Sequence, residues 1–330
     1  MNIMILSRKD VQEAVTMPQA IETVKQAYIS LARNEVILPL RTQVPVREFE
    51  GTTLFMPAYL PKIKSLGAKI VSVFPQNLKY DKPTIHAFVI ICDASTGQPA
   101  AIMDGTFLTA LRTGAASGVA TDLLAREQAK TAAIIGAGIQ GRAQLEAICC
   151  VRKIQRVLVY DKNCLAAETF SEEMQNRGFP IPRDISVAPS SKKAIAEADV
   201  ICAATTSSVP VFEDVHLKPG VHINGVGSYT PQMQEIPEKT IMRAKVVVDS
   251  LAASLEEAGD IIIPIEKGLI DQTHIRGEIG QVAAGSLAVR EVDEDITFFK
   301  SVGLAIQDVA VAELALRNAA SLGLGTHFDL

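Results

Sequence analysis

Three basic residues of the first third of the chain, Arg41, Lys69 and Arg112, lie in or directly after apolar runs. A charge in such surroundings is costly unless it is paired. Surface snorkelling or an internal salt bridge would satisfy these residues. The alternative is one pocket in which three cations surround a small carboxylate, with arginine supplying a two-pronged fork and lysine a point charge whose pKa can shift. This second interpretation predicts an anionic substrate.

A glycine-rich turn follows the apolar run Thr131–Ile135, opens a segment with helical spacing and is followed by a β-rich run at residues 157–160. Strand, turn, helix and strand in this order form a dinucleotide-binding unit. Gly136 makes the tight turn, Gly138 lets the backbone approach a pyrophosphate, and Gly141 lets the helix pack against the strand. The N–H groups that begin the helix attract phosphate. The residues assigned to the cofactor here are Gly136, Gly138, Ile139, Gln140 and Gly141.

An acidic residue, Asp161, ends this unit about twenty residues after the last glycine, where a carboxylate can accept hydrogen bonds from an adenosine ribose. It would repel a 2′-phosphate, so NAD(H) is the favoured cofactor. Lys162 could offset that repulsion, which leaves NADP(H) open.

Polar and small residues also follow two later apolar runs, residues 200–204 and 221–225. Parallel strands would place them at the edge of the sheet where dinucleotides bind, although polar loops that cap helices have the same composition. The residues assigned to the cofactor on this ground are Thr205, Thr206, Val226, Gly227 and Ser228.

The remaining candidate residues are weaker. His86 on a probable strand is assigned to the substrate together with Ser228, although a lone histidine is more often structural. The other histidines show no metal-binding spacing, so no metal is expected, and no Gly-x-Ser-x-Gly elbow is present. The five cysteines form neither a metal motif nor an even framework, and we interpret them as reduced residues of a cytoplasmic protein.

The composition indicates a globular enzyme of two domains. The chain has 330 residues, 48% of them hydrophobic, and a net charge of −5 without a basic stripe, which argues against nucleic acid as a partner. The N-terminus does not resemble a signal peptide, and no apolar stretch reaches about 18 residues, so no membrane association is expected.

The pattern of elements predicts an α/β fold in which a doubly wound parallel sheet is joined to a smaller α+β N-terminal domain. The proposed boundaries are residues 1–112 with 305–330 and residues 113–304. A Ser7-x-x-Asp10 pattern predicts a capped first helix. Expected helices are 17–33, 106–126 and 304–321; expected strands are 37–46, 52–59, 68–74, 86–92 and 99–103 in a mostly antiparallel or mixed sheet, then 131–135, 157–160, 185–188, 200–205, 221–225, 246–249 and a last one near 297.

The chain resembles the ornithine cyclodeaminase/μ-crystallin family over nearly its full length. The residues that carry the likeness are Phe55-Met56-Pro57, Gly67-Ala68-Lys69, 93–97, 108–118, 135–141, 202–206, 225–231 with Glu235, and 299–303. The resemblance implies a Rossmann domain, an N-terminal substrate and dimerisation domain completed by the C-terminal helix, and a homodimer. It also implies that Arg41, Lys69 and Arg112 hold the substrate carboxylate.

Two departures from the family pattern separate its chemistries, which membership alone does not settle. The cyclodeaminases and archaeal-type alanine dehydrogenases carry an aspartate where this chain has Tyr229, and the cyclodeaminases carry a glutamate where it has Leu54. The chain is therefore more similar to the ketimine reductases, which reduce Δ1-pyrroline-2-carboxylate and Δ1-piperideine-2-carboxylate to L-proline and L-pipecolate. In that chemistry Arg41 and Arg112 orient the carboxylate, Lys69 binds it and supplies a proton, and Gly303 lets the backbone approach the nicotinamide.

Three alternatives remain open at this stage. They are an ornithine cyclodeaminase that releases ammonia, an alanine or other amino-acid dehydrogenase, and a non-catalytic NAD(P)H-binding protein like the crystallins of the family.

Overall fold

The computed structural model describes residues 2–329, and their contacts divide the chain into two compact units. The first unit comprises Met1–Arg112 and Leu304–Leu330, and the second comprises Thr113–Gly303. The chain passes from the first to the second within helix α3 (Gly105–Leu124) and returns at Gly303–Leu304.

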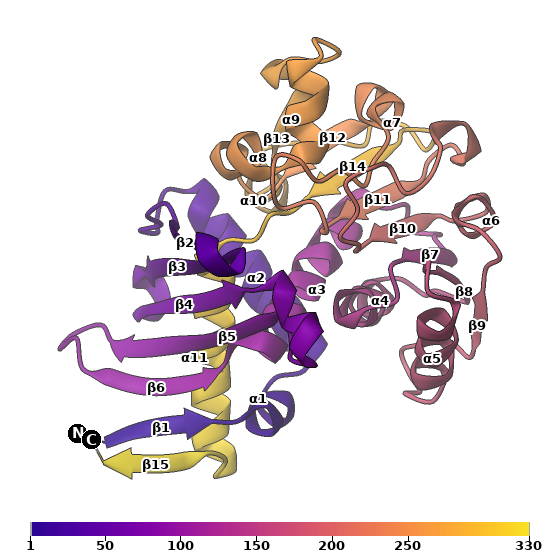
Figure 1. The fold of residues 1–330 in the computed structure, drawn as a ribbon. Helices are drawn as coiled ribbons and strands as arrows, with labels where there is room; N and C mark the ends of the chain where they lie inside the picture. The colour runs from indigo at the N-terminus through magenta and orange to yellow at the C-terminus, as the bar shows by residue number, and fades with distance from the viewer. Residues whose placement is uncertain (1, 330) are drawn as a thin grey trace. The chain divides into compact units, whose positions relative to one another are not determined.

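The first unit contains a seven-stranded mixed sheet in the order β15-β1-β6-β5-β4-β3-β2 (Figure 1). Neighbouring strands are antiparallel except β1 and β6, which are parallel, so the prediction of a mixed sheet is confirmed. The strands are β1 (Asn2–Leu6), β2 (Thr42–Val46), β3 (Gly51–Leu60), β4 (Ser65–Val73), β5 (Ile85–Asp93), β6 (Pro99–Asp104) and β15 (Thr326–Asp329).

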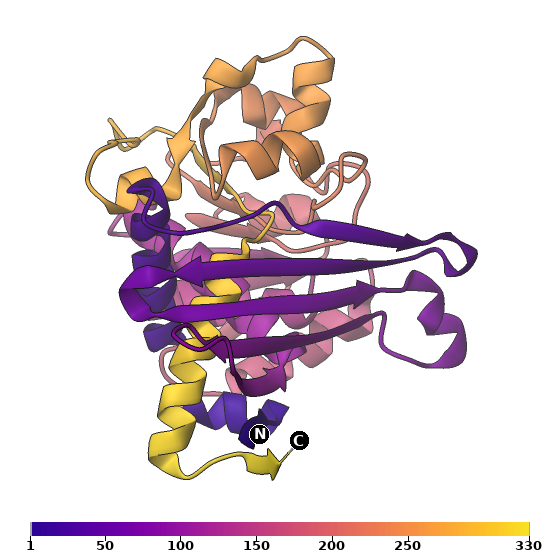
Figure 2. The same cartoon turned by 90° about the vertical axis from the view of Figure 1, so that its left-hand side faces the viewer.

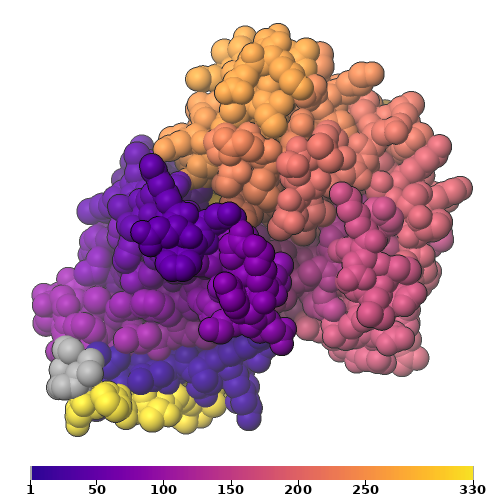
Figure 3. Space-filling model, in the orientation of Figure 1, coloured from indigo at the N-terminus to yellow at the C-terminus, as the bar shows by residue number. Residues whose placement is uncertain are grey.

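The two ends of the described chain meet in this sheet. The yellow C-terminal segment lies along the indigo N-terminal segment at the surface (Figure 3), where β15 pairs with β1. Neither strand was predicted from the sequence, and the strand predicted at 37–46 starts five residues before β2 begins at Thr42. Ile37 instead forms an isolated bridge to Tyr59.

Three helices complete the first unit: α1 (Arg8–Ala14), α2 (Met17–Ala32) and α11 (Ala305–Leu322). The predicted cap of α1 is confirmed, because the Ser7 backbone N–H donates to Asp10 Oδ2 at 2.8 Å and the Asp10 N–H donates to Ser7 Oγ at 3.3 Å. Helix α11 packs on β3, β4, β5 and α2 (Figure 2). Along β4, buried residues alternate with less buried ones, because only one face of the strand packs against this helix.

The second unit is a doubly wound α/β domain, as predicted. Its eight strands are all parallel, in the order β13-β12-β14-β11-β10-β7-β8-β9. They are β7 (Thr131–Ile135), β8 (Arg156–Tyr160), β9 (Asp184–Val187), β10 (Val200–Ala203), β11 (His222–Gly225), β12 (Lys245–Val248), β13 (Ile275–Glu278) and β14 (Thr297–Lys300). The accompanying helices are α4 (Ile139–Val151), α5 (Cys164–Gln175), α6 (Ser191–Ile195), α7 (Glu238–Arg243), α8 (Leu251–Glu257), α9 (Gly259–Glu266) and α10 (Ile279–Ala283).

Both faces of this sheet are buried. Along β7, Ala133 and Ile135 belong to one hydrophobic cluster, whereas Ala132 and Ile134 belong to the other. This explains why the strand is a continuous apolar run. The strand order reverses between β7 and β10, and the crevice beyond the carboxyl ends of such a pair is where open α/β sheets bind ligands.

Candidate active site

The glycine turn between β7 and α4 has the geometry of a phosphate cradle. Gly136 has a φ of +102°, and a Cβ there would lie 2.5 Å from the carbonyl oxygen of Ala204. A Cβ on Gly141 would lie 2.1 Å from the Gly136 carbonyl oxygen, which fixes the close approach of helix and strand. A Cβ on Gly138 would meet nothing within 4 Å, so the space beside this residue is open. Gly138 also caps α4 without a side-chain acceptor, which leaves N–H groups at the helix start for an anion.

A pocket of about 410 Å³ lies at the point where the strand order reverses. It brings together five of the predicted cofactor residues, together with apolar residues that can contact an adenine ring. Its lining residues are Ile135, Gly136, Gly138, Tyr160, Asp161, Lys162, Ser191, Ala204, Thr205, Thr206, Ser207, Pro210 and Val211.

Asp161 is fixed at the edge of this pocket. Its Oδ2 accepts from the Ala137 N–H at 2.8 Å and its Oδ1 accepts from the Asn163 N–H at 2.9 Å. Arg142 does not face the pocket, because it pairs with Glu173 at 2.6 Å, donates to the Ala137 carbonyl and stacks over Phe170. A carboxylate held in place in a pocket whose lining residues include no arginine favours the ribose hydroxyls of NAD(H) over a 2′-phosphate.

Three predicted loop residues have defined backbone roles. The Val226 N–H donates to the Ala203 carbonyl, which extends the pairing of β10 and β11, while the Gly227 N–H donates to Glu235. Gly303 has a φ of +85°, and its N–H donates to Asp249 at 2.8 Å.

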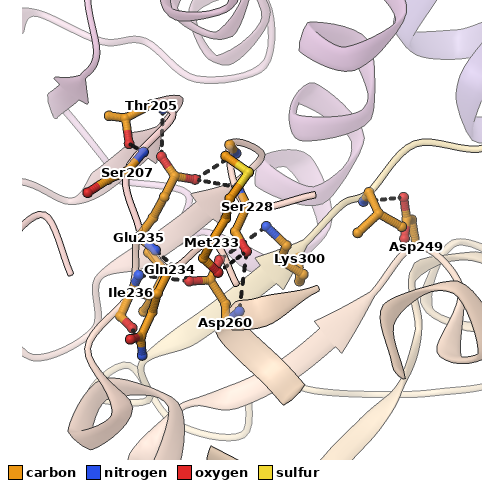
Figure 4. A network of polar contacts seen from close by, with 12 residues as sticks. Thr205, Ser207, Ser228, Met233, Gln234, Glu235, Ile236, Asp249, Asp260 and Lys300 are labelled. Atoms are coloured by element: carbon orange, nitrogen blue, oxygen red, sulfur yellow. Dashed lines mark hydrogen bonds and ion pairs between the residues drawn. The ribbon is translucent and has the colours of Figure 1, made fainter. Parts of the chain in front are cut away.

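Ser228, predicted to bind both cofactor and substrate, uses its hydroxyl within the protein. Its hydroxyl donates to the Met233 carbonyl at 2.7 Å and accepts from the Asp260 N–H, and the residue is fully buried (Figure 4). The hydroxyl is therefore used to hold its own loop and is not directed at a substrate.

Two of the predicted cations form one buried cluster in the first unit. Lys69 on β4 and Arg112 on α3 are 2% and 5% exposed, and both contact Asp308 on α11, which is fully buried. The Lys69 Nζ lies 2.9 Å from Asp308 Oδ2, and the Arg112 Nε lies 2.8 Å from Asp308 Oδ1. Gln307 accepts a further hydrogen bond from Arg112 Nη1 at 2.7 Å.

The protonation of Lys69 is set by this cluster. Burial, followed by the charge of Arg112, lowers the pKa of Lys69 from 10.5 to about 8, while Asp308 opposes the shift. The charge of Arg41 also lowers this pKa, less than the charge of Arg112 does. A lysine with this pKa can give up a proton near neutral pH.

Sequence reasoning missed Asp308 and Gln307. Both lie in the apolar stretch 304–321, which we predicted as a final helix that completes the N-terminal domain, with no site residue in it. A carboxylate inside such a run was the available signal, because a buried charge requires a partner.

The structure places His86 away from the cluster. On β5 it pairs with Ser72, whereas Lys69 pairs with Val89. Since successive side chains of a strand point to opposite faces, His86 lies on the exposed face of the sheet and Lys69 on the face that packs against α11. His86 therefore does not face the cluster of Lys69, Arg112 and Asp308.

Among residues 2–329, no group of three or more histidine, cysteine, aspartate or glutamate side chains is placed to hold a metal ion. No helix in that range is long and apolar enough to cross a membrane.

Comparisons with known proteins agree with this geometry. The model of the ornithine cyclodeaminase/mu-crystallin family matches residues 1–322. A Δ1-pyrroline-2-carboxylate reductase of Bacillus cereus is 40% identical over 99% of this chain and 100% of its own. The solved structure of Δ1-pyrroline-2-carboxylate reductase from Thermococcus litoralis, in complex with NADH and L-proline, has a TM-score of 0.95 and 43% identity, covering 98% of this chain and 99% of its own. An archaeal alanine dehydrogenase dimer with bound NAD has a TM-score of 0.93 and 35% identity, covering all of both chains.

Proposed function

The chain belongs to the ornithine cyclodeaminase/mu-crystallin family, and we propose that it is an NADH-dependent imine reductase. Its substrate is a cyclic 2-imino acid, Δ1-pyrroline-2-carboxylate or Δ1-piperideine-2-carboxylate, and its product is L-proline or L-pipecolate. The buried cluster of Lys69, Arg112 and Asp308 carries this proposal.

The cluster suits a small carboxylate. Two cations share one carboxylate in the contacts among these three side chains, so a positive charge is left over in a place with little water. An entering carboxylate would balance that charge, and the planar guanidinium of Arg112 would fix its orientation. We assign Arg41 to the same carboxylate because its charge acts on Lys69.

NADH fits the second unit. The open side of Gly138 and the uncapped start of α4 would hold the pyrophosphate, and Asp161 would hold the adenosine ribose. Ile139 and Gln140 belong to the same helix start, and Thr205 and Thr206 line the pocket. The loops of Val226–Gly227 and Gly303 would hold the part of the cofactor that lies beyond the pyrophosphate and the adenosine. When bound, the cofactor supplies the hydride that reduces C2 of the imine.

Lys69 holds the proton that this reaction needs. An imine accepts hydride at C2 when its nitrogen is protonated, and the amine then forms directly. The ammonium of Lys69 keeps the substrate carboxylate in place and can donate that one proton to a neutral imine nitrogen, leaving Lys69 as the free amine, since its pKa lies near neutrality.

The neighbourhood of Lys69 argues against cyclodeamination of ornithine. Leu54 lies on the same face of the sheet as Lys69, because it pairs with Val71 and Lys69 pairs with Met56. This is the position from which a carboxylate could hold a distal ammonium, and leucine offers none. Tyr229 in the second unit also lacks a carboxylate. Burying the terminal charge of ornithine unpaired would cost several kcal/mol.

A spectrophotometric screen tests the proposal. The purified chain is incubated with NADH and either cyclic imino acid, and in parallel with pyruvate and ammonium, which the similarity to alanine dehydrogenase makes the second candidate. We expect NADH oxidation with the imino acids and little with pyruvate. Release of ammonia from ornithine without net change in NADH would instead identify a cyclodeaminase.

A further inference from the structure

We propose that Glu235 is a positioning residue for the dinucleotide, and that its buried carboxylate joins two cofactor-binding loops without touching the cofactor. The loops are the Thr205 loop, which follows β10, and the Gly227–Ser228 loop, which follows β11. The inference rests on the proposed binding of NADH.

The carboxylate is the shared acceptor of both loops (Figure 4). Its Oε1 accepts from the Thr205 N–H at 2.6 Å. Its Oε2 accepts from the N–H groups of Gly227 at 2.6 Å and Ser228 at 3.2 Å. Backbone N–H groups beyond the end of a strand have no ladder partner, so without Glu235 the two buried donors of Gly227 and Ser228 and the part-buried donor of Thr205 would lose their acceptor.

The two loops are packed closely against each other at Gly227. A Cβ on Gly227 would lie 2.1 Å from the Thr205 carbonyl oxygen and 2.5 Å from the carboxyl carbon of Glu235. Glu235 itself is 0% exposed, so water cannot replace it as the acceptor. Because Thr205 and Thr206 line the pocket, a shift of this loop changes the surface offered to the cofactor.

Glu235 is in turn held by a buried ion pair. Asp260 on α9 accepts from the backbone N–H groups of Glu235 at 2.7 Å and Ile236 at 2.9 Å. The Lys300 Nζ on β14 lies 3.1 Å from Asp260 Oδ2. Both members of the pair are fully buried, so two carboxylates share one ammonium in a dry environment.

This arrangement makes the proposed role sensitive to pH. The charged groups that act on Glu235 are Lys300 and Asp260. Burial raises the pKa of Glu235 to about 7, with Lys300 opposing the shift and Asp260 adding to it. The ionised carboxylate accepts all three N–H groups, whereas a protonated one carries no charge and turns one oxygen into a donor. The affinity for NADH should therefore fall as the pH falls through about 7.

The test compares Glu235→Gln with a matched control, Asp199→Asn. Asp199 accepts from the N–H groups of Lys130 and Thr131 at the opposite, amino-terminal edge of the same sheet. Binding of NADH to the full chain is followed by fluorescence between about pH 8 and about pH 6, one unit either side of a neutral pKa. Thermal unfolding without cofactor is measured in parallel.

We expect the wild-type Kd for NADH to rise as the pH falls. At the alkaline end Glu235→Gln should raise the Kd on the order of 10- to 100-fold, since charge-assisted hydrogen bonds are lost, and should remove the pH dependence. Asp199→Asn should lower the melting temperature while keeping the wild-type Kd and its pH dependence. A Glu235→Gln protein that binds NADH with the wild-type Kd and pH dependence would overturn this inference but not the proposed function. If this variant does not fold, a wild-type Kd that stays constant over the pH range overturns it. Absence of NADH binding by the wild type would overturn the proposed function as well.

Discussion

At the scale of single residues, the proposed chemistry depends on Lys69, whose pKa of about 8 lets it change protonation state near neutral pH. Lys69 would lose its proton readily in the protein interior, and Arg112 adds to that tendency, but Asp308 restores part of the ammonium form. The cations were predictable from their apolar neighbours along the chain. The pairing of Asp308 with them was not, because Asp308 lies 239 residues from Lys69 and 196 from Arg112, and only the tertiary fold brings them together.

Asp308→Asn tests this balance. Removing the carboxylate takes away the interaction that favours the Lys69 ammonium, so the pKa of Lys69 should fall below about 8. The protonated form is lost as the pH rises through this pKa, and the alkaline limb of kcat/KM should therefore move to lower pH, by about one unit or more. Ionisation of the substrate affects both proteins equally and cancels in the comparison. An unshifted alkaline limb in a folded variant would show that Lys69 is not the proton donor.

Asp161 is predicted to decide between the two reductants. Its two hydrogen bonds hold the carboxylate at the pocket, where Lys162 is the one basic residue among the lining residues. An exposed lysine contributes roughly 1 kcal/mol or less, so the carboxylate should dominate and NADH should be preferred. Asp161→Ser should raise kcat/KM for NADPH relative to NADH, measured by steady-state kinetics with each reductant. Lys162→Ala, the matched control, should not. An unchanged ratio in Asp161→Ser would remove this residue as the discriminator.

At the scale of elements, a buried polar chain joins two central strands of the second unit to α3. His222 on β11 contacts Thr297 on β14 at 2.9 Å and Asn224 at 3.1 Å, and Asn224 donates to Thr121 on α3 at 2.9 Å. Burial, aided by the charge of Arg290, lowers the pKa of His222 from 6.5 to about 3. The folded protein therefore keeps this imidazole neutral.

This network predicts a defined loss of stability in acid. Below pH 6.5 the unfolded chain binds a proton at His222 that the folded chain does not, so stability falls as the pH falls from 6.5 towards about 3. The loss approaches roughly 1.4 kcal/mol per pH unit. His222→Gln should be less stable than wild type at neutral pH, and the difference should shrink in acid, as measured by urea unfolding at each pH. His327→Gln, on exposed β15, serves as the control. A difference independent of pH would contradict a neutral, buried His222.

Some helices, strands and turns could be predicted from the sequence and others could not. The glycine turn, the α1 cap and the long helices were predictable because their signals are local. Strands β1, β13 and β15 were missed, although the equally short β10 and β12 were predicted from their continuous apolar runs. β13 and β15 are mostly polar and carry no such signal. Their partners are supplied by tertiary structure, as when β15 at one end of the chain pairs with β1 at the other.

At the scale of the whole molecule, the sheet of the first unit presents an apolar face away from α11. Phe55, Ile70 and Phe88 are aligned across β3, β4 and β5, and the two phenylalanines are 40% and 39% exposed. Contiguous apolar surface of this kind marks an interface. The alanine dehydrogenase relative is described as a dimer, and we propose that two copies of this chain also associate through this face.

Sedimentation tests the dimer. The wild type should sediment as a dimer at micromolar concentration, and Phe88→Glu should yield monomer, because a two-fold interface would bury the new charge in both copies. Phe179→Glu alters a phenylalanine that is 100% exposed in the second unit and should leave the dimer intact. A monomeric wild type, or a dimeric Phe88→Glu protein, would contradict this assignment.

The central claim is that a buried cation cluster holds the carboxylate of a cyclic imine that NADH reduces. The most direct measurement is kcat/KM for Δ1-pyrroline-2-carboxylate, together with the Kd for NADH, in wild type, Arg112→Ala and the exposed control Arg317→Ala. Losing the arginine should cost about 2–4 kcal/mol of transition-state stabilisation, so kcat/KM should fall roughly 30- to 1000-fold. The Kd for NADH should remain close to the wild-type value, and Arg317→Ala should behave as wild type. Undiminished turnover in a folded Arg112→Ala protein, or a wild type that forms no L-proline as it consumes NADH, would contradict the account.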